Sequence, residues 1–473
     1  MLFHTFEFFL LLSVSIIAYF AFPKARVYII ALANIVFYSA SGIGYLVLFV
    51  AVAFITYFCS LKLSKTNKKI FFYIALIANV FNLLFFKYTG FVLSNIETML
   101  NIRFPWQDEF LSLIILPVGI SFYTFQMIAY LVDVRKKELK PCHSFVKFWV
   151  FISFFGQLIA GPIMRGKEFL PQINNLESLK VKPTNIKYGL YFIVMGLIKK
   201  IIFADMLARQ VNLYYSDVAS ITPLDAWFAT YLFAFQIYFD FSSYSEMAVG
   251  LGYLFGLKLN LNFKSPYISS NATEFWKRWH ITLSTWIRDY IYFPIGGAKK
   301  GALRRYINII IAMTISGLWH GAAWTFIIWG AYHGVLSVAH KLYDKFLKRF
   351  GFEFTRSKIY KAISIFVFFH IVCLGWVLFR AGSFNDALIL FNKMLSIGSV
   401  FDSRLLFYKL GLVLMLYGFH VLEYFLRKNE IKSGYYWKKY VPSFARAFCY
   451  IIIFILLALF TQGEENTFIY FQF

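Results

Sequence analysis

The chain has 473 residues, of which 60% are hydrophobic and only 15% are charged. Soluble globular domains are about 45–50% apolar and about 25% charged, so this composition, with a mean hydropathy of +0.64, excludes an ordinary soluble protein. The net charge of +24 resides in short stretches between long apolar runs, which is typical of cytoplasmic loops rather than of nucleic-acid binding. We predict an all-α, polytopic integral membrane protein that contacts membrane lipid and does not bind nucleic acid.

Apolar runs recur along the whole chain, and a membrane span needs roughly 20 apolar residues. We predict about 10–13 membrane helices, together with re-entrant or interfacial helices, because several runs are short or contain Gly or Pro. The candidate ranges are 3–22, 27–42, 43–61, 70–91, 111–133, 145–163, 185–204, 223–239, 245–258, 305–340, 358–379, 404–426 and 443–462. We expect a single membrane domain over 1–473, with N-terminal helices in 1–100, a core in 111–340 and C-terminal helices in 358–473.

The first apolar run lacks the preceding basic segment of a cleavable signal peptide. Positive charge follows it instead, at Lys24 and Arg26. This charge order predicts that the N-terminus lies outside and the first loop inside. The four cysteines are far apart in the sequence and show no metal-binding spacing, so we expect them to pack within helices and predict no metal site.

The segment 271–290 combines cations with tryptophans. Asn271 or Thr273 is expected to cap a helix, with Glu274 in its first turn. In one continuous helix, the apolar side chains at 276, 279, 283 and 286 would share a face, and such a helix would lie at an interface or line the mouth of a cavity. An interfacial anchor is the alternative interpretation of the same pattern.

The run from Tyr306 to His340 contains no Lys, Arg, Asp or Glu. As one helix it would be about 52 Å long at 1.5 Å per residue, which exceeds a hydrocarbon core of about 30 Å. We therefore expect it to be tilted, broken or divided into two helices. Gly317 and Gly321 are four residues apart, which permits close approach of a second backbone and suggests a break beside His320.

His320 and His280 are the strongest candidates for chemistry. A histidine at membrane depth costs free energy unless it has a partner or lines a wet cavity, so His320 is a functional candidate. A neutral imidazole in such a site is a suitable general base near pH 7. His333 and His340 are interpreted as interfacial or core residues. Asp240 and Glu246 are expected to line a pathway, or to form buried contacts with a cation such as Arg165 or Arg288.

Six stretches of the sequence resemble the membrane-bound O-acyltransferase (MBOAT) family. The first two are WKRWHITLSTWIRDY (276–290) and GLWHG (317–321), which look like the family signature. The others resemble its bacterial alginate and peptidoglycan O-acetylation branch: LPVGISFYTFQ (116–126), QLIAGPI (157–163), QIYFDFSSYS (236–245) and FIYFQF (468–473). Ser243 is one departure, because this branch usually has Gly there.

The resemblance implies a helical core that encloses a central funnel or tunnel, with 111–340 as the catalytic core. It implies that His320 matches the catalytic histidine and His280 the second polar residue of the site. We also predict that a further set of side chains lines the substrate path. These are Trp276, Arg278, Trp279, Ser284, Arg288, Asp289, Trp319 and Asp240.

The function implied by the resemblance is transfer of acetyl from cytoplasmic acetyl-CoA, for O-acetylation of a cell-envelope polysaccharide such as alginate-like exopolysaccharide or peptidoglycan. The implied location is the bacterial inner membrane, crossed several times, with no bound cofactor. An extracytoplasmic serine-hydrolase-like acetyltransferase is the implied partner. D-alanyl transfer to teichoic acid, a transporter or flippase for an acyl or glycan intermediate, and a scaffold for an envelope-synthesis complex remain alternatives.

Overall fold

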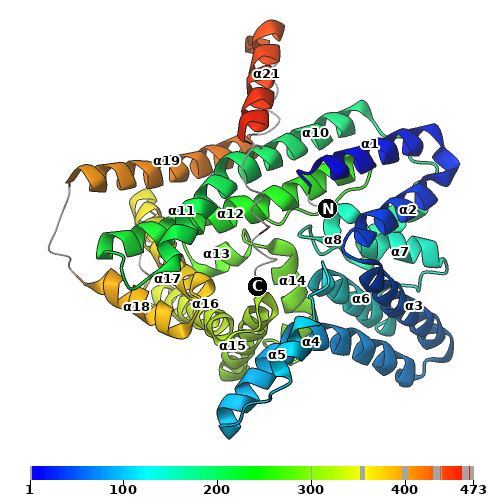
Figure 1. The fold of residues 1–473 in the computed structure, drawn as a ribbon, viewed down its shortest axis with the longest axis horizontal. Helices are drawn as coiled ribbons and strands as arrows, with labels where there is room; N and C mark the ends of the chain where they lie inside the picture. The colour runs from blue at the N-terminus through cyan, green and yellow to red at the C-terminus, as the bar shows by residue number, and fades with distance from the viewer. Residues whose placement is uncertain are drawn as a thin grey trace.

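The computed structural model describes residues 3–299, 301–351, 357–396, 403–429, 437, 439–460 and 468. This part of the chain forms helices and loops without a β-strand, which confirms the all-α prediction (Figure 1). The first eleven α-helices are α1 (Phe6–Ala21), α2 (Arg26–Ser39), α3 (Ile43–Thr66), α4 (Lys69–Leu100), α5 (Gln107–Ser112), α6 (Ile120–Arg135), α7 (Phe145–Ser153), α8 (Phe155–Leu158), α9 (Gly166–Asn174), α10 (Pro183–Leu197) and α11 (Asp205–Ser216).

The remaining α-helices follow along the chain. They are α12 (Pro223–Leu254), α13 (Ala272–Trp276), α14 (Ile281–Ile287), α15 (Gly301–His320), α16 (Trp324–Phe350), α17 (Lys358–Arg380), α18 (Phe384–Leu395), α19 (Ser403–Lys428) and α21 (Ser443–Phe460). Short 3-10 helices are η1 (Pro23–Ala25) and η3 (Pro266–Ile268), and π-helices are η2 (Ile198–Ala204) and η4 (Arg288–Tyr292). Figure 1 shows α21 projecting away from the rest of the molecule.

Helix α12 crosses the middle of the molecule and is buried along most of its length (Figure 1). A capping box starts it, because the Thr222 hydroxyl accepts from the Asp225 amide at 3.1 Å and the Asp225 carboxylate accepts from the Thr222 amide at 3.3 Å. The prediction of two helices at 223–239 and 245–258 is wrong. The polar residues between these two ranges belong to the same continuous helix. The charge of Asp240 is tolerated inside the bundle because it forms an ion pair with Lys200 at 3.0 Å.

Four helices of the described chain are long and apolar enough to cross a membrane: α3, α4, α17 and α19. Helices α1 and α2 are bent by 119° relative to one another, and they add a fifth candidate span if together they cross the membrane once. Large apolar side chains on these helices are exposed, for example Phe81 and Phe407, as lipid contact requires. These helices support a membrane protein, and the total of 10–13 membrane helices stays a prediction.

The uncharged run 306–340 is divided between α15 and α16, which confirms the predicted break. Helix α15 ends at His320, and α16 begins at Trp324. The two helices run antiparallel with their backbones in close approach. A Cβ atom at Gly317 would lie 2.2 Å from the Phe326 carbonyl oxygen, and one at Gly334 would lie 2.8 Å from the Ile310 Cα. Small residues permit this packing, as they do in helix pairs of membrane proteins.

The expected continuous helix over 271–290 is wrong. Asn271 does cap α13, accepting from the Glu274 amide at 2.9 Å, but the helix ends at Trp276 and α14 starts at Ile281. Backbone bonds with another segment replace helical bonds here. The Lys264 amide donates to the Arg278 carbonyl at 3.0 Å, and the Ile281 amide donates to Asn262 at 2.9 Å. Because the side chains at 279, 283 and 286 are buried, the interfacial anchor is also wrong.

Candidate active site

His280 and His320 lie side by side although 40 residues separate them in the sequence. Their ring centroids are 6.4 Å apart, and both residues are almost completely buried, at 0% and 2% exposure. Neither ring nitrogen of His280 has a hydrogen-bond partner among the described residues. Buried polar groups are normally hydrogen-bonded, so the imidazole of His280 retains capacity to bind a polar group of a substrate.

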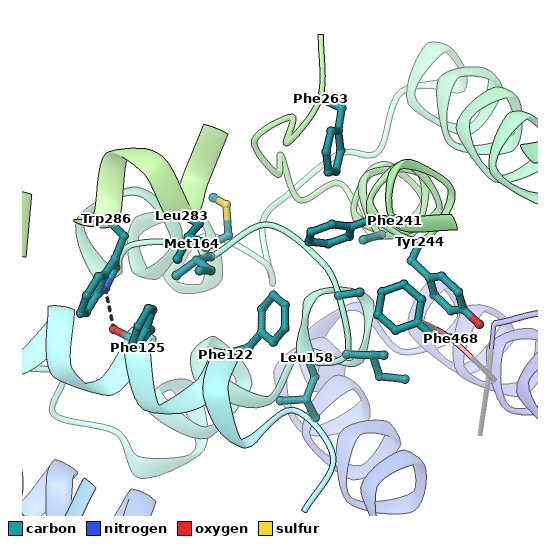
Figure 2. Close-up of a cluster of buried hydrophobic side chains, with 14 of the residues drawn as sticks. Phe122, Phe125, Leu158, Met164, Phe241, Tyr244, Phe263, Leu283, Trp286 and Phe468 are labelled. Atoms are coloured by element: carbon teal, nitrogen blue, oxygen red, sulfur yellow. Dashed lines mark hydrogen bonds between the residues drawn. The ribbon is translucent and has the colours of Figure 1, made fainter. Parts of the chain in front are cut away.

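Aromatic rings surround the histidine pair. Trp319 contacts both members, with ring centroids 5.9 Å from His280 and 4.9 Å from His320. Other rings close to one of the histidines include Phe122, Phe241, Phe263, Trp329 and Phe379, with centroid distances of 4.6–6.5 Å. Figure 2 shows Phe122 and Phe241 entering the same buried cluster from different helices. Such walls exclude bulk water and strengthen electrostatic interactions at the imidazoles.

His280 is held in an unusual backbone conformation. Its φ of 40° is in the left-handed region, which is uncommon for residues other than glycine, and it is the N-cap of α14. The next residues are fixed by Asn262, whose side chain accepts from the Thr282 hydroxyl at 2.6 Å. The same hydroxyl accepts from the Ile163 amide at 3.0 Å. Tertiary hydrogen bonds therefore hold a strained conformation, as is common at functional sites.

His320 is held by its position at the C-terminal end of α15. The last carbonyls of a helix lack intrahelical donors, and cations near this end are favourable. Lys87 of α4 satisfies two of these carbonyls, since its amine donates to the carbonyl of Trp319 at 2.6 Å and to that of His320 at 2.9 Å. The Tyr88 hydroxyl donates to the Leu318 carbonyl at 2.8 Å. Three successive carbonyls are thus satisfied from one neighbouring helix.

A cavity of about 230 Å³ lies beside the pair. Its lining includes Lys87, Phe122 and Trp319, together with 116–121 at the start of α6. Phe122 and Trp319 also contact His280, so the cavity and the histidine share two walls. Neither histidine lines the cavity itself, so the cavity adjoins the pair through these two rings.

The structure places the other predicted site residues at different distances from the pair. Trp276 packs on Trp329 and His333, and Trp279 packs on Trp376 at a centroid distance of 4.8 Å, so both belong to the aromatic surroundings. The Ser284 hydroxyl donates to the Trp279 carbonyl at 3.3 Å. These contacts are with the walls of the site, and a role in binding substrate stays a prediction.

The charged candidates form ion pairs. Arg278 pairs with Glu274 at 2.9 Å. Asp289 pairs with Arg288 at 2.7 Å and with Arg165 at 2.8 Å, outside the helices that are long enough to cross a membrane. Burial acts to raise the pKa of Asp289, but the hydrogen bond from Arg288 and the charge on Arg165 outweigh it and lower the pKa. Asp289 is therefore a carboxylate at neutral pH.

Asp240 and Glu246 form buried ion pairs, which confirms the predicted buried contacts, but the expected partners Arg165 and Arg288 are wrong. Asp240 pairs with Lys200, and Glu246 pairs with Lys199 at 2.5 Å. Both lysines lie in the π-helix η2, next to one another in the sequence, and the wider turn directs both toward α12. The sequence pattern could not show this because neither lysine stands in a recognisable motif.

Two residues near the pair, Lys87 and Trp329, are not identified from the sequence as part of the site. Lys87 could have been found, since it is a cation within the apolar run 70–91 and intramembrane charges mark functional sites. Trp329 and His333 lie in α16, where the sequence gives no signal beyond apolar spacing. The His333 ring is stacked on Phe275 with centroids 5.9 Å apart and is buried, which confirms that it is a core residue.

The arrangement supports proton transfer in a dry pocket. Two imidazoles lie close enough to contact one small substrate group, and the Trp319 ring packs against both of them. Neutral imidazole can accept a proton from a hydroxyl as that hydroxyl attacks a carbonyl carbon. Within the described residues, no three His, Cys, Asp or Glu side chains gather in a way that could hold a metal ion.

Comparison with known proteins identifies the family. The sequence model of MBOAT, the membrane-bound O-acyltransferase family, matches residues 131–384. This chain is 37% identical to "Peptidoglycan O-acetyltransferase" of Helicobacter pylori over 408 residues, which cover 80% of this chain and 75% of that protein.

Two further relatives are named for other reactions. The chain is 34% identical to "Probable alginate O-acetylase AlgI" of Pseudomonas aeruginosa, over 80% of this chain and 72% of that protein. It is 29% identical to "Teichoic acid D-alanyltransferase" of Bacillus subtilis, over 57% of this chain and 69% of that protein. The matched region 131–384 contains both histidines. The chain belongs to the membrane-bound O-acyltransferase family, in the bacterial branch of peptidoglycan and alginate O-acetylation, and it is an O-acyltransferase.

Proposed function

We propose that the chain is a membrane O-acetyltransferase in which His320 is the general base for acetyl transfer from acetyl-CoA toward a cell-envelope polysaccharide. The single observation that carries this proposal is the buried pairing of His320 with His280 beside a cavity, within the matched family region. The polysaccharide is either a peptidoglycan or an alginate-like exopolysaccharide, since the peptidoglycan O-acetyltransferase and the probable alginate O-acetylase each match 80% of this chain.

In the proposed reaction, His320 accepts the proton of an acceptor hydroxyl as its oxygen attacks the thioester carbonyl. The new C–O bond forms, the C–S bond breaks, and the thiolate of CoA leaves with the electron pair. The proton on His320 then passes to the thiolate or to water, which restores the neutral base. A positioned base of this kind contributes typically ~10²–10⁴-fold to the rate.

His280 is proposed to orient the acceptor or to polarise the carbonyl. Its ring nitrogens have no hydrogen-bond partner among the described residues, and its ring faces the same space as His320. A donor aimed at the developing oxyanion stabilises the transition state more than the ground state. For that role one ring nitrogen of His280 carries its proton toward the carbonyl oxygen.

The protein is proposed to lie in a bacterial inner membrane, which it crosses several times, with the donor on the cytoplasmic side. The acceptor then lies at or beyond the outer face. A separate extracytoplasmic serine-hydrolase-like acetyltransferase is the proposed partner that completes transfer to the glycan. No bound cofactor is needed in this scheme, because acetyl-CoA is consumed as a substrate.

D-alanyl transfer to teichoic acid is the alternative with a specific observation in its favour, which is the similarity to the Bacillus subtilis relative. That similarity covers less of this chain and has lower identity than the similarity to the O-acetylation relatives. The two functions differ in the donor, which would be acetyl-CoA in one and a D-alanyl carrier-protein thioester in the other.

The test uses the full chain, purified and reconstituted in proteoliposomes. Acetyl-CoA labelled in the acetyl group is supplied on one side, and polysaccharide with the partner on the other. We expect label in ester linkage to the glycan and release of free CoA. Ester formation only from a D-alanyl carrier-protein thioester, with release of the carrier thiol and no consumption of acetyl-CoA, would support the alternative. Movement of an unmodified intermediate without ester formation would support a transporter and overturn the proposal.

A further inference from the structure

A second cavity, of about 470 Å³, lies apart from the histidine pair. It is bordered by α10, η2, α12, α19 and the segment 261–278, and neither His280 nor His320 lines it. Most of its wall is apolar: Phe192, Met195, Phe203, Phe239, Phe419 and Leu422. A hydrocarbon chain would be compatible with this wall, because burying apolar surface against it is favourable.

The floor of the cavity is a neutral network of buried charges. Lys199 lies 2.5 Å from both Glu246 and Glu423. Arg427 lies 2.7 Å from Glu423 and also contacts Glu246, so two cations face two acids. Buried charges need such partners. The floor therefore has no excess charge with which to attract an ion.

The rim carries excess positive charge. Arg278 and Lys428 lie 5.7 and 5.9 Å from the centroid of the Tyr424 ring, and the Arg278 side chain donates to the Lys264 carbonyl at 3.0 Å. Glu274 balances Arg278. Lys264 and Lys428 are exposed, and neither has an ion-pair partner among the described residues. The cavity thus joins an apolar wall to a cationic edge.

We propose that this cavity binds an anionic phospholipid, with its acyl chain along the apolar wall and its phosphate at Lys264 and Lys428. An amphiphile of this charge is complementary to both parts of the cavity. The Tyr19 hydroxyl donates to the Phe255 carbonyl at 2.7 Å, which places the C-terminal end of α12, about two turns beyond Glu246 of the cavity, beside the end of α1 that precedes Lys24 and Arg26. The charge order predicts that this end faces the cytoplasm, where anionic lipids attract basic groups.

The bound lipid would contact the segment that carries His280. Arg278 lies on the rim, and His280 follows it two residues later in the strained turn. The lipid site is distinct from acyl transfer, and its occupancy can be measured without any turnover. Failure of the lipid proposal would leave the proposed acetyl transfer unaffected.

The test measures binding of phosphatidylglycerol and of phosphatidylcholine with identical chains to the purified full chain in detergent, by native mass spectrometry and by thermal stability. We expect selective retention of phosphatidylglycerol. The double variant K264Q/K428Q should weaken that retention roughly 10–30-fold, because two cations near an anionic headgroup are lost, and should leave phosphatidylcholine unchanged. Its matched control is K345Q/K361Q, which removes two exposed lysines elsewhere.

Three outcomes would overturn the proposal. The first is equal retention of the two lipids by the unmodified protein. The second is an equal loss of phosphatidylglycerol in the control variant, which would indicate an effect of net charge alone. The third is displacement of phosphatidylglycerol by inorganic phosphate or by CoA at the same concentration, which would assign the cations to a soluble anion.

Discussion

His320 and Lys87 show how single residues define the site. His320 is the last residue of α15, so the helix backbone sets the position of its imidazole. The amine of Lys87 holds that backbone in turn, because it donates to the carbonyls of Trp319 and His320. These two carbonyls have no donor within the helix, so this contact fixes the end of the helix. The position of the imidazole therefore depends on a residue more than 200 positions earlier in the chain.

Replacing Lys87 with Met should lower kcat by roughly 5–150-fold, since two hydrogen bonds of about 0.5–1.5 kcal/mol each are lost from the backbone that positions His320. The KM for acetyl-CoA should change less than kcat, because the Lys87 amine is bonded to the carbonyls of Trp319 and His320 and so acts through the position of His320. Lys87→Arg keeps the charge and donors and should recover part of kcat. Steady-state kinetics of both variants would measure this. Equal loss in both, with a lower melting temperature, would indicate a role in folding alone.

Much of the site could be predicted from residue patterns, and part of it could not. His280 and His320, which the structure brings together, can be predicted as candidates because each follows a tryptophan in apolar sequence and matches a family motif. The partners of Asp240 and Glu246 were wrong because ion pairing depends on the geometry of η2, which presents Lys199 and Lys200 to α12. Local sequence contains no information on contacts between elements so far apart.

The hairpin of α15 and α16 is the element on which the histidine pair depends. Its break could be predicted because an uncharged run of that length exceeds the thickness of a bilayer. The turn at His280 could not be predicted, because the helical pattern of 271–290 is interrupted by hydrogen bonds to Asn262 and Lys264 rather than by Gly or Pro. Tertiary contacts overrode a strong local preference.

Replacing Gly317 with Ala should destabilise the hairpin. The new Cβ would lie 2.2 Å from the Phe326 carbonyl oxygen, so the two backbones must move apart, at a cost of about 1–3 kcal/mol or more. The matched control is Gly411→Ala in α19, where no atom lies within 4 Å of the added Cβ. Thermal melting in detergent should show a lower midpoint for Gly317→Ala alone. Equal midpoints would argue against close packing of α15 and α16.

At the scale of the whole molecule, buried ion pairs attach the outer helix α19 to the core. Lys199, Glu246, Glu423 and Arg427 come from three different elements and are mostly buried. Composition alone predicts the all-α membrane class, but not these attachments. Because charged residues lie inside the bundle as well as in loops, the length of an apolar run does not predict where its helix lies in this fold.

Replacing Glu423 with Leu should lower the free energy of unfolding by about 3–5 kcal/mol, because it leaves Lys199 and Arg427 with one acid between them. The double variant K199M/E423L should be less unstable than either single variant, since the uncompensated charge is removed. Asp344→Asn is the control, because its pair with Lys348 is largely exposed and contributes about 0–1 kcal/mol. Chemical denaturation of the purified variants measures these differences, and additive effects in the double variant would contradict a coupled network.

The most direct test of the central claim is acetyl transfer by His320→Ala. The variant should retain the melting temperature and donor affinity of the unmodified chain, while kcat falls by about 10²–10⁴-fold, the usual contribution of a general base. His143→Ala is the control, because His143 is exposed and outside the site, and its kcat should stay unchanged. Acetyl transfer by folded His320→Ala at the unmodified rate would contradict the account.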